Sequence, residues 1–149
     1  MFVTNSLSGG GAERATNILV NALHDSGIKV SLVPINDGVR DLVEPKCEIF
    51  ELKRQWQGGI FTLFSAFFSL QRTIWSWKPT IIVLNCDLPE LLGSLSIGSR
   101  KLVAVEHATF PWTKRVQLGK IVRMLLEFRR VRWVSVSDHL SIWQSKQIA

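Results

Sequence analysis

The sequence predicts an α/β domain with an open, mostly parallel sheet of about six strands and helices on both faces of that sheet. Short aliphatic runs alternate along the chain with longer segments in which apolar residues recur at helical spacing. The clearest run is Thr-Ile-Ile-Val-Leu-Asn at residues 80–85, which has the continuous branched-aliphatic character of a central parallel strand. The length of 149 residues fits a single domain.

Composition excludes a disordered chain, because 46% of the residues are hydrophobic. The formal net charge is +6, and the excess lies in residues 100–149, where Lys and Arg greatly outnumber Asp and Glu. A basic surface that carries Trp suits anionic lipid, nucleic acid or a phosphorylated substrate. The sequence contains no recognisable nucleic-acid-binding motif, so we expect no nucleic-acid partner.

Cysteine usage and hydropathy indicate a cytoplasmic protein. Cys47 and Cys86 lie far apart and form no Cys-x-x-Cys motif, so neither a metal site nor a disulfide framework is expected. No signal peptide is recognisable. The longest apolar run, residues 59–70, is shorter than the ~20 residues that cross a bilayer, so we expect no membrane span.

A glycine-rich turn, Ser-Leu-Ser-Gly-Gly-Gly-Ala-Glu-Arg at residues 6–14, lies between two predicted elements. Residues 1–5 predict a strand, and about residues 12–24 predict an amphipathic helix. Gly27 is placed to end this helix in a left-handed conformation.

The turn has two explanations. Its glycines allow positive φ and close approach of a ligand, and the unpaired N–H groups at the start of the helix suit an anion such as phosphate. The residues of this candidate anion site are Gly9, Gly10, Gly11 and Ala12. A tight turn that only brings the helix close to the sheet explains the glycines equally well.

The string from Ser8 to Thr16 resembles the opening of family 4-like glycosyltransferases of the GT-B fold, where a strand ends in a turn of the Gly-Gly-Ala-Glu-Arg type. The resemblance implies two Rossmann-like domains that face each other across a cleft. The N-terminal domain would hold the acceptor, and the C-terminal domain would hold most of the nucleotide-sugar. Residues 1–149 would form the N-terminal domain, one half of a GT-B fold, and the C-terminal donor-binding domain would be absent.

The next segments predict two strands, at residues 28–34 and 47–52, with an Asn-Asp-Gly turn at residues 36–38. Residues 60–77 then predict a helix that is apolar nearly all round. Such a helix is typical of a buried core element. Alternatively, its Phe and Trp side chains form a ridge that enters the membrane interface, next to the basic loop at residues 53–59.

Lys78 and Pro79 are expected to end this helix, before the central strand at residues 80–85. A short helix should follow, with Asp87 as its N-cap and with Gly98-Ser99 at its end. Residues 101–105 predict a fifth strand.

Ligands of a parallel α/β sheet bind at the carboxyl ends of its strands, so residues 5–11, 85–87 and 106–109 should lie along one edge. The glycine turn and His107 are expected to be neighbours there. The Glu106-His107 pair also resembles members of the same family that make polysaccharides, in which the histidine contacts the donor sugar. The alternative is a structural histidine.

A basic amphipathic helix is predicted at about residues 113–130. It is either a solvated surface or an attachment site for an anionic leaflet, at roughly 1 kcal/mol per cation. The candidate membrane-surface residues are Lys120, Arg123, Arg129 and Arg130. A sixth strand is predicted at residues 133–137, with Ser137 as the cap of a final helix. Its Val-Ser-Val-Ser sequence resembles the end of the N-terminal domain in these glycosyltransferases, so the resemblance covers the whole chain.

The resemblance implies a retaining enzyme that transfers a sugar from a nucleotide-sugar co-substrate to a polysaccharide or lipid-linked acceptor at the cytoplasmic membrane face. The amides of the glycine turn would stabilise charge on the departing diphosphate. His107 would orient the donor sugar, with Glu106 as a second catalytic candidate. Acceptor hydroxyls would meet Glu13, Asn85 and Asp87. No metal or other cofactor is implied.

The chain departs from the family, because no two of its glutamates have seven residues between them. We therefore expect a fragment, or one subunit of a split enzyme with a donor-domain partner chain, that is inactive or nearly so alone. A second hypothesis is a non-catalytic module that binds a membrane surface or recruits a partner.

Overall fold

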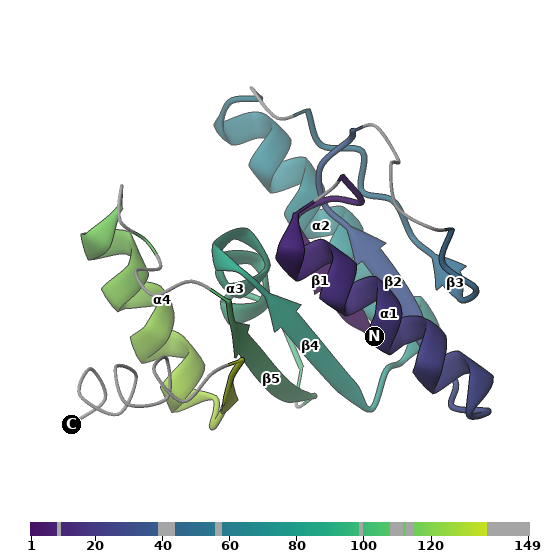
Figure 1. Ribbon diagram of the computed structural model, residues 1–149. Helices are drawn as coiled ribbons and strands as arrows, with labels where there is room; N and C mark the ends of the chain where they lie inside the picture. The colour runs from purple at the N-terminus through teal and green to yellow at the C-terminus, as the bar shows by residue number, and fades with distance from the viewer. Residues whose placement is uncertain are drawn as a thin grey trace.

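The computed structural model describes residues 1–8, 10–38, 44–55, 58–98, 100–107, 112 and 115–136. Its strands are β1 (Phe2–Thr4), β2 (Ser31–Pro34), β3 (Glu48–Ile49), β4 (Ile81–Asn85), β5 (Lys101–Glu106) and β6 (Arg132–Ser135). They form one sheet in the order β3-β2-β1-β4-β5-β6 (Figure 1), and every neighbouring pair is parallel. The predicted α/β class with a six-stranded open parallel sheet is confirmed.

Helices cover both faces of the sheet (Figure 1). They are α1 (Gly11–Asp25), α2 (Ile60–Trp77), α3 (Asp87–Ser94) and α4 (Val116–Phe128). Successive side chains of a strand point to opposite faces, so the sheet supports two apolar clusters. The smaller cluster joins Val20 of α1 to Leu32 of β2. The larger one contains Leu70 of α2, Leu92 of α3 and Val122 of α4.

The end of α1 follows the sequence prediction. Gly27 has a φ of 77°, in the left-handed region that glycine adopts without strain. Its N–H donates to the His24 carbonyl at 2.9 Å, and the Ile28 N–H donates to the Leu23 carbonyl at 3.0 Å. This pair of bonds is the Schellman motif, which satisfies the last carbonyls of the helix.

The helix α2 has the predicted bounds, but it is not buried all round. Residues Ala66, Leu70 and Ile74 form its buried face. Its opposite side exposes Phe61, which is 86% exposed, together with Phe64, Phe68 and Trp75. The prediction of a fully buried helix is therefore wrong, because only one face of α2 meets the sheet. None of the helices in the described ranges is both long and apolar enough to cross a bilayer.

Three element ends differ from the predictions. The strand β3 is only two residues long, although the Leu52 N–H still donates to the Pro34 carbonyl at 3.1 Å. The helix α3 begins at Asp87, with Cys86 and not Asp87 at the N-cap. It also ends at Ser94, earlier than predicted, where the Ser94 hydroxyl donates to the Leu91 carbonyl at 2.8 Å.

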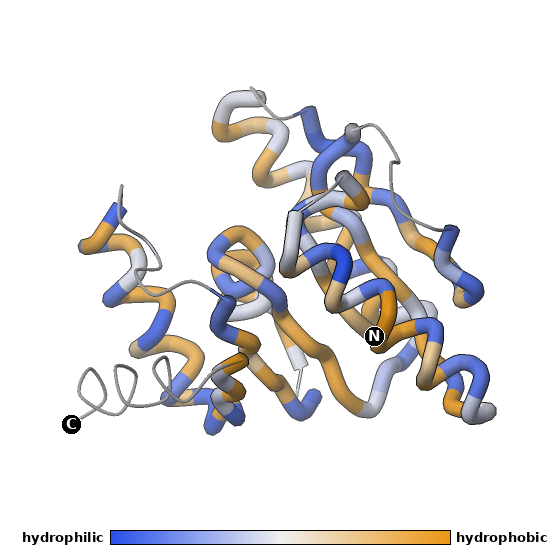
Figure 2. The backbone as a smooth tube through the Cα atoms, in the orientation of Figure 1, coloured by the Kyte–Doolittle hydropathy of each residue, from blue (hydrophilic) through white to orange (hydrophobic). Residues whose placement is uncertain are grey.

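The remaining differences are smaller. The strand β2 begins at Ser31, three residues after the predicted start, and β6 spans Arg132–Ser135. The predicted start of α4 at Thr113, and the Ser137 cap with the final helix, lie outside the described residues. Figure 2 shows that β4 is mainly hydrophobic, whereas α1 alternates between hydrophobic and hydrophilic residues, as expected for a buried strand and a half-exposed helix.

Two glycine substitutions should have different effects, because Gly93 lies where α3 packs closely on β4 and Gly11 lies at the open start of α1. A Cβ at Gly93 would lie 2.5 Å from Cδ1 of Leu84, which is fully buried and cannot move away. We expect Gly93→Ala to lower the free energy of unfolding by about 1–3 kcal/mol. Gly11→Ala, where nothing lies within 4 Å, should leave it unchanged or raise it slightly. Urea unfolding of both variants measures the difference, and equal effects would contradict the packing.

Candidate functional site

The carboxyl edge of the sheet brings together the segments that follow β1, β4 and β5. The chain passes from β1 to β2 on one side, and β4 lies on the other side of β1, so the order of strands reverses between β1 and β4. Ligands of open α/β sheets bind in the crevice at such a switch point. As predicted, Asn5, Asn85 and His107 follow or end adjacent strands on this edge. However, β4 separates β1 from β5, so the glycine turn and His107 are not direct neighbours.

Asn85 and His107 form the contact at the centre of this edge. The His107 Nε2 lies 3.4 Å from the Asn85 Oδ1. Burial lowers the pKa of His107, so the imidazole is neutral at pH 7. Asn85 is 2% exposed, and its Nδ2 has no hydrogen-bond partner within the described structure. Rotating the amide by 180° would only transfer the deficit to its oxygen, so in either orientation one buried polar atom of Asn85 lacks a partner among the described residues.

At Gly10 and Gly11 the glycine turn does not take the predicted backbone conformation. Gly10 is the N-cap of α1 with a φ of −73°, and Gly11 is the first helical residue, so neither uses positive φ. Gly9 lies outside the described residues. A Cβ at Gly10 would lie 2.0 Å from Oε2 of Glu13. The Glu13 carboxylate therefore folds back beside Gly10, and as the far end of a flexible side chain it can move aside for a Cβ there.

This carboxylate changes the electrostatics of the candidate anion site. A helix N-terminus carries positive partial charge, and Glu13 already supplies the negative charge that this end attracts. A phosphate at Gly10, Gly11 and Ala12 would meet the negative charge of the nearby Glu13 carboxylate. The turn as folded is therefore less attractive to a diphosphate than its sequence indicates.

Cys86 holds a strained backbone at the switch point. It lies between β4 and α3 with φ 75° and ψ 175°, a conformation that is essentially restricted to glycine. Strained turns between a strand and a helix can present a nucleophile, but burial, together with the negative charges of Glu13 and Asp87, raises the pKa of this thiol to about 12. The thiol stays protonated at pH 7, so Cys86 is no thiolate nucleophile.

The strain predicts that glycine is the best residue at position 86. Cys86→Gly and Cys86→Ala both lose the thiol, but only the alanine variant keeps a Cβ in the restricted conformation. We expect Cys86→Gly to be more stable than Cys86→Ala by about 1–3 kcal/mol. Chemical unfolding of the two variants measures this difference directly. Equal stabilities would mean that the backbone at this position is relaxed.

A group of buried carboxylates lies behind the edge, and sequence reasoning missed its central member. Glu90 of α3 is fully buried, and its Oε2 accepts a hydrogen bond from Nε1 of Trp112 at 3.1 Å. The Asp87 Oδ2 accepts from the Trp112 backbone N–H at 3.1 Å. Glu106 of β5 is 3% exposed and pairs with Arg123 of α4. The three-residue spacing of Asp87 and Glu90, which puts both on one face of a helix, was the sequence signal for this group.

Burial controls the protonation of these carboxylates. Desolvation, together with the negative charge of Glu106, raises the pKa of Glu90 to about 8. Burial also raises the pKa of Glu106 and of Asp87, against the opposing charge of Arg123. Glu90 is therefore neutral at pH 7. The Glu106 carboxylate faces α4, so its predicted role at the open edge would require the Arg123 pair to break.

Two of the four predicted membrane-surface cations are used inside the fold. The Arg123 guanidinium pairs with Glu106 and lies 4.9 Å from the ring centre of Trp133. Arg129 donates to the Gly93 carbonyl at 2.6 Å and to the Ser96 Oγ at 2.8 Å. These contacts tie α4 to the end of α3. Lys120 and Arg130 are exposed.

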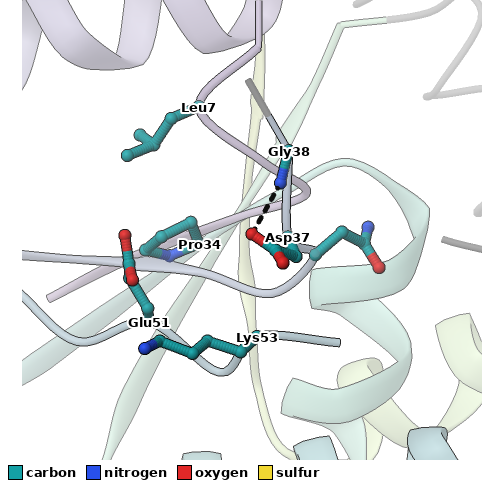
Figure 3. A pocket seen from close by; sticks show the side chains of 7 residues that line it. Leu7, Pro34, Asp37, Gly38, Glu51 and Lys53 are labelled. Carbon is teal, nitrogen blue, oxygen red and sulfur yellow. Dashed lines mark hydrogen bonds between the residues drawn. The ribbon is translucent and has the colours of Figure 1, made fainter. Parts of the chain in front are cut away.

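Three hollows on the described part of the chain lie away from Asn85 and His107. The first lies at the carboxyl ends of β2 and β3, and Figure 3 shows Asp37 accepting a hydrogen bond from the Gly38 N–H at 3.0 Å there. Its volume of about 20 Å³ holds one water and not a sugar. A second hollow, of about 490 Å³, lies between residues 49–53 and α2. A third, mainly apolar hollow of about 480 Å³ opens at the opposite, amino edge near Phe2 and Ile81.

The described residues contain no group of three or more His, Cys, Asp or Glu side chains that could hold a metal ion. The groups that meet at the centre of the carboxyl edge are neutral hydrogen-bonding groups, namely the Asn85 amide and the His107 imidazole. Such groups orient hydroxyls, and they carry no fixed charge with which to bind a phosphate.

The sequence matches no protein-family model and no curated protein. Among solved structures, the chain is similar to the UDP-N-acetylglucosamine 2-epimerase from Rickettsia bellii, with a TM-score of 0.65 and 11% sequence identity. The match covers 98% of this chain and 40% of the epimerase chain. At this identity the likeness concerns the fold alone. The chain has a GT-B-like Rossmann fold and spans less than half the length of the structure that it matches.

Proposed function

We propose that this chain is the acceptor-side domain of a sugar-nucleotide enzyme, a retaining glycosyltransferase that transfers a sugar from a nucleotide-sugar to a polysaccharide or lipid-linked acceptor. The observation that carries the proposal is the contact of Asn85 with a neutral His107 at the switch point of the sheet. The resemblance of residues 8–16 to family 4-like glycosyltransferases supports it. So does the fold likeness to an enzyme whose name gives a nucleotide-sugar as its substrate.

The residues at this edge suit an acceptor better than a nucleotide. The His107 imidazole is half-buried and can donate or accept a hydrogen bond, so it can bind a sugar hydroxyl, while the buried Asn85 amide lies against it. The Glu13 carboxylate at the start of α1 opposes a diphosphate there. Most of the nucleotide affinity would then reside in a second domain, supplied by a longer protein or by a partner chain.

Calorimetric titration of the purified chain tests this assignment. We expect UDP-N-acetylglucosamine and UDP to bind with Kd values of about 1 mM or weaker, equivalent to roughly 4 kcal/mol. Free N-acetylglucosamine should bind more weakly to the His107→Ala variant than to the wild-type chain. The control variant His24→Ala, at the exposed end of α1, should bind this sugar as the wild-type chain does. Micromolar binding of the nucleotide, about 8 kcal/mol, would show a complete nucleotide site in this chain and overturn the acceptor-side assignment.

The outer side of α4 favours a second candidate function, attachment to an anionic membrane. Ile121, Met124 and Phe128 recur at helical spacing and are 52%, 61% and 87% exposed. Lys120 and Arg130 are also exposed, before and after these residues along the chain. An apolar stripe accompanied by cations is typical of helices that lie in the membrane interface.

Vesicle co-sedimentation tests the membrane candidate. The chain should sediment with vesicles that contain phosphatidylglycerol and not with vesicles of phosphatidylcholine alone. Charge reversal at Lys120 and Arg130 should abolish this binding. The control Lys101→Glu, at the exposed start of β5, should leave it unchanged. Binding that is indifferent to lipid charge or to the two substitutions would remove this candidate.

A further inference from the structure

The outer side of α2 carries an aromatic stripe that the proposed function does not use. Its members are the exposed side chains of Phe61, Phe64, Phe68 and Trp75. Residues at these spacings lie along one side of a helix. The opposite side of α2, with Leu70 at its centre, packs into the larger apolar cluster. The aromatic stripe therefore points away from the sheet.

The helices α2 and α4 cover the same face of the sheet. Leu70 of α2 and Val122 of α4 belong to one apolar cluster, whereas α1 packs into the other cluster on the opposite face. The outer side of α4 exposes Ile121, Met124 and Phe128. The apolar side chains of both helices therefore point away from the same face of the sheet.

The loop that follows α3 joins these two helices. Gln71 of α2 accepts a hydrogen bond from the Ile97 N–H at 2.7 Å, and its Nε2 donates to the Ile97 carbonyl at 3.4 Å. Arg129, at the C-cap of α4, donates to the Ser96 Oγ at 2.8 Å. In the same loop, the side chains of Leu95 and Ile97 are exposed. Exposed apolar side chains thus extend from α2 through this loop to α4, and we call this surface the α2–α4 face.

The charges of the α2–α4 face are mainly positive. The helix α2 contains no Asp or Glu, and its charged residue, Arg72, is exposed within the aromatic stripe. On α4 the exposed charged residues are Lys120 and Glu127, and the exposed Lys78 and Arg130 follow the two helices. By contrast, α1 on the opposite face carries two carboxylates and one arginine. The positive charge is therefore concentrated on the face that also exposes the apolar side chains.

This combination complements an anionic bilayer. Trp and other aromatic side chains are favoured at the membrane interface, and each exposed cation is attracted to anionic headgroups. A second copy of the chain would bring the same cations against Arg72 and Lys120, and like charges oppose such an interface. The charge of the α2–α4 face thus favours a lipid surface over self-association.

We propose that the α2–α4 face inserts into the interface of a bilayer that contains anionic phospholipid, with the aromatic stripe of α2 as the inserted element. This inference rests on the second candidate function, attachment through α4, and deepens it. The cations Lys120 and Arg130 supply the charge-dependent attraction, and the stripe of α2 supplies the apolar burial. The acceptor-side assignment does not enter the inference.

Quenching of tryptophan fluorescence by brominated lipid tests whether α2 inserts. The vesicles contain phosphatidylglycerol and a phosphatidylcholine with brominated acyl chains, which quench the tryptophans that they contact. We expect Trp75→Phe to show a smaller quenched fraction than the wild-type chain. Trp77→Phe is the matched control, because Trp77 lies on another side of α2, where its indole N–H donates to Glu48 Oε2 at 3.0 Å. This control should keep the wild-type quenched fraction.

A pair of double variants tests the contribution of the stripe to binding. Phe61→Gln with Phe68→Gln should lower the vesicle partition coefficient by about 100-fold, because two exposed aromatic side chains no longer leave water. The control, Ile18→Gln with Leu19→Gln, removes two exposed apolar side chains from α1 on the opposite face and should bind as the wild-type chain does. Glutamine is a good helix former, so both variants should fold, which urea unfolding verifies.

The outcomes separate this inference from the candidate functions. If the wild-type chain sediments with anionic vesicles while Trp75→Phe keeps its quenching and the Phe61/Phe68 variant keeps its partition coefficient, insertion of α2 is overturned and attachment through α4 stands. If the chain binds no vesicle, both are overturned. A dimer in analytical ultracentrifugation that the Phe61/Phe68 variant loses, without vesicle binding, would assign the face to a second copy. None of these results bears on sugar binding, which tests the acceptor-side assignment separately.

Discussion

The Glu90→Gln variant is expected to keep much of the stability that the wild-type protein loses as the pH rises from 5 to 8. In the folded protein the pKa of Glu90 is about 8, whereas its ordinary value is 4.5. Over this range the unfolded chain has released the proton while the folded chain retains it. The stability that Glu90 contributes is therefore complete below pH 4.5 and is lost as the pH rises to 8, at roughly 1.4 kcal/mol per pH unit.

Urea unfolding of wild-type protein and Glu90→Gln at several pH values measures this effect. Glutamine is similar in shape and accepts the Trp112 bond, so the two proteins should differ little near pH 5. Their free energies of unfolding should then diverge with rising pH, with the variant more stable. Asp87 and Glu106 titrate in both proteins, so their contributions to the pH dependence cancel in the difference between the two free energies of unfolding. Parallel curves would contradict a raised pKa at Glu90.

Removing the Arg123 guanidinium should destabilise the fold by about 3–5 kcal/mol at pH 7. The Arg123→Met variant leaves Glu106, which is 3% exposed, as an unpaired buried carboxylate and removes the contact with the Trp133 ring. Burial already raises the pKa of Glu106, and without Arg123 it should rise further. Protonation of Glu106 should therefore restore part of the lost stability near pH 5.

The double variant Arg123→Met with Glu106→Gln is the control for this prediction. It removes both charges together, and replacing a buried ion pair by neutral groups of similar size costs far less than breaking it. We expect the double variant to recover most of the stability that Arg123→Met loses. Additive losses in the double-mutant cycle would mean that the two side chains do not interact.

Local sequence signals predicted the elements whose limits are set by backbone chemistry. The helix α2 has the predicted bounds because a Gly-Gly pair precedes it and Lys78-Pro79 ends it. Gly27 ended α1 as predicted, and the aliphatic run of β4 indicated a central strand. The limits of β3 were not predictable, because an edge strand depends on pairing with β2 rather than on its own pattern.

The candidate site was only partly predictable. The α/β pattern predicts parallel strands whose carboxyl ends share one edge, and this placed Asn85 and His107 on that edge. The strained Cys86 and the buried Glu90 depend on how α3 packs on β4, which no local pattern encodes. Arg123 looked like a surface cation on a helical pattern, and only tertiary contact shows that its charge compensates Glu106.

Chemical-shift mapping by NMR tests the central claim most directly, namely that the carboxyl edge of β1, β4 and β5 binds the sugar. Backbone amides of the labelled full chain would be followed during titration with N-acetylglucosamine and, separately, with UDP-N-acetylglucosamine. The account predicts that the largest changes for both ligands cluster at Asn5, at residues 85–87 and at Glu106 and His107. Changes confined to the apolar hollow at the amino edge, near Phe2 and Ile81, would contradict it.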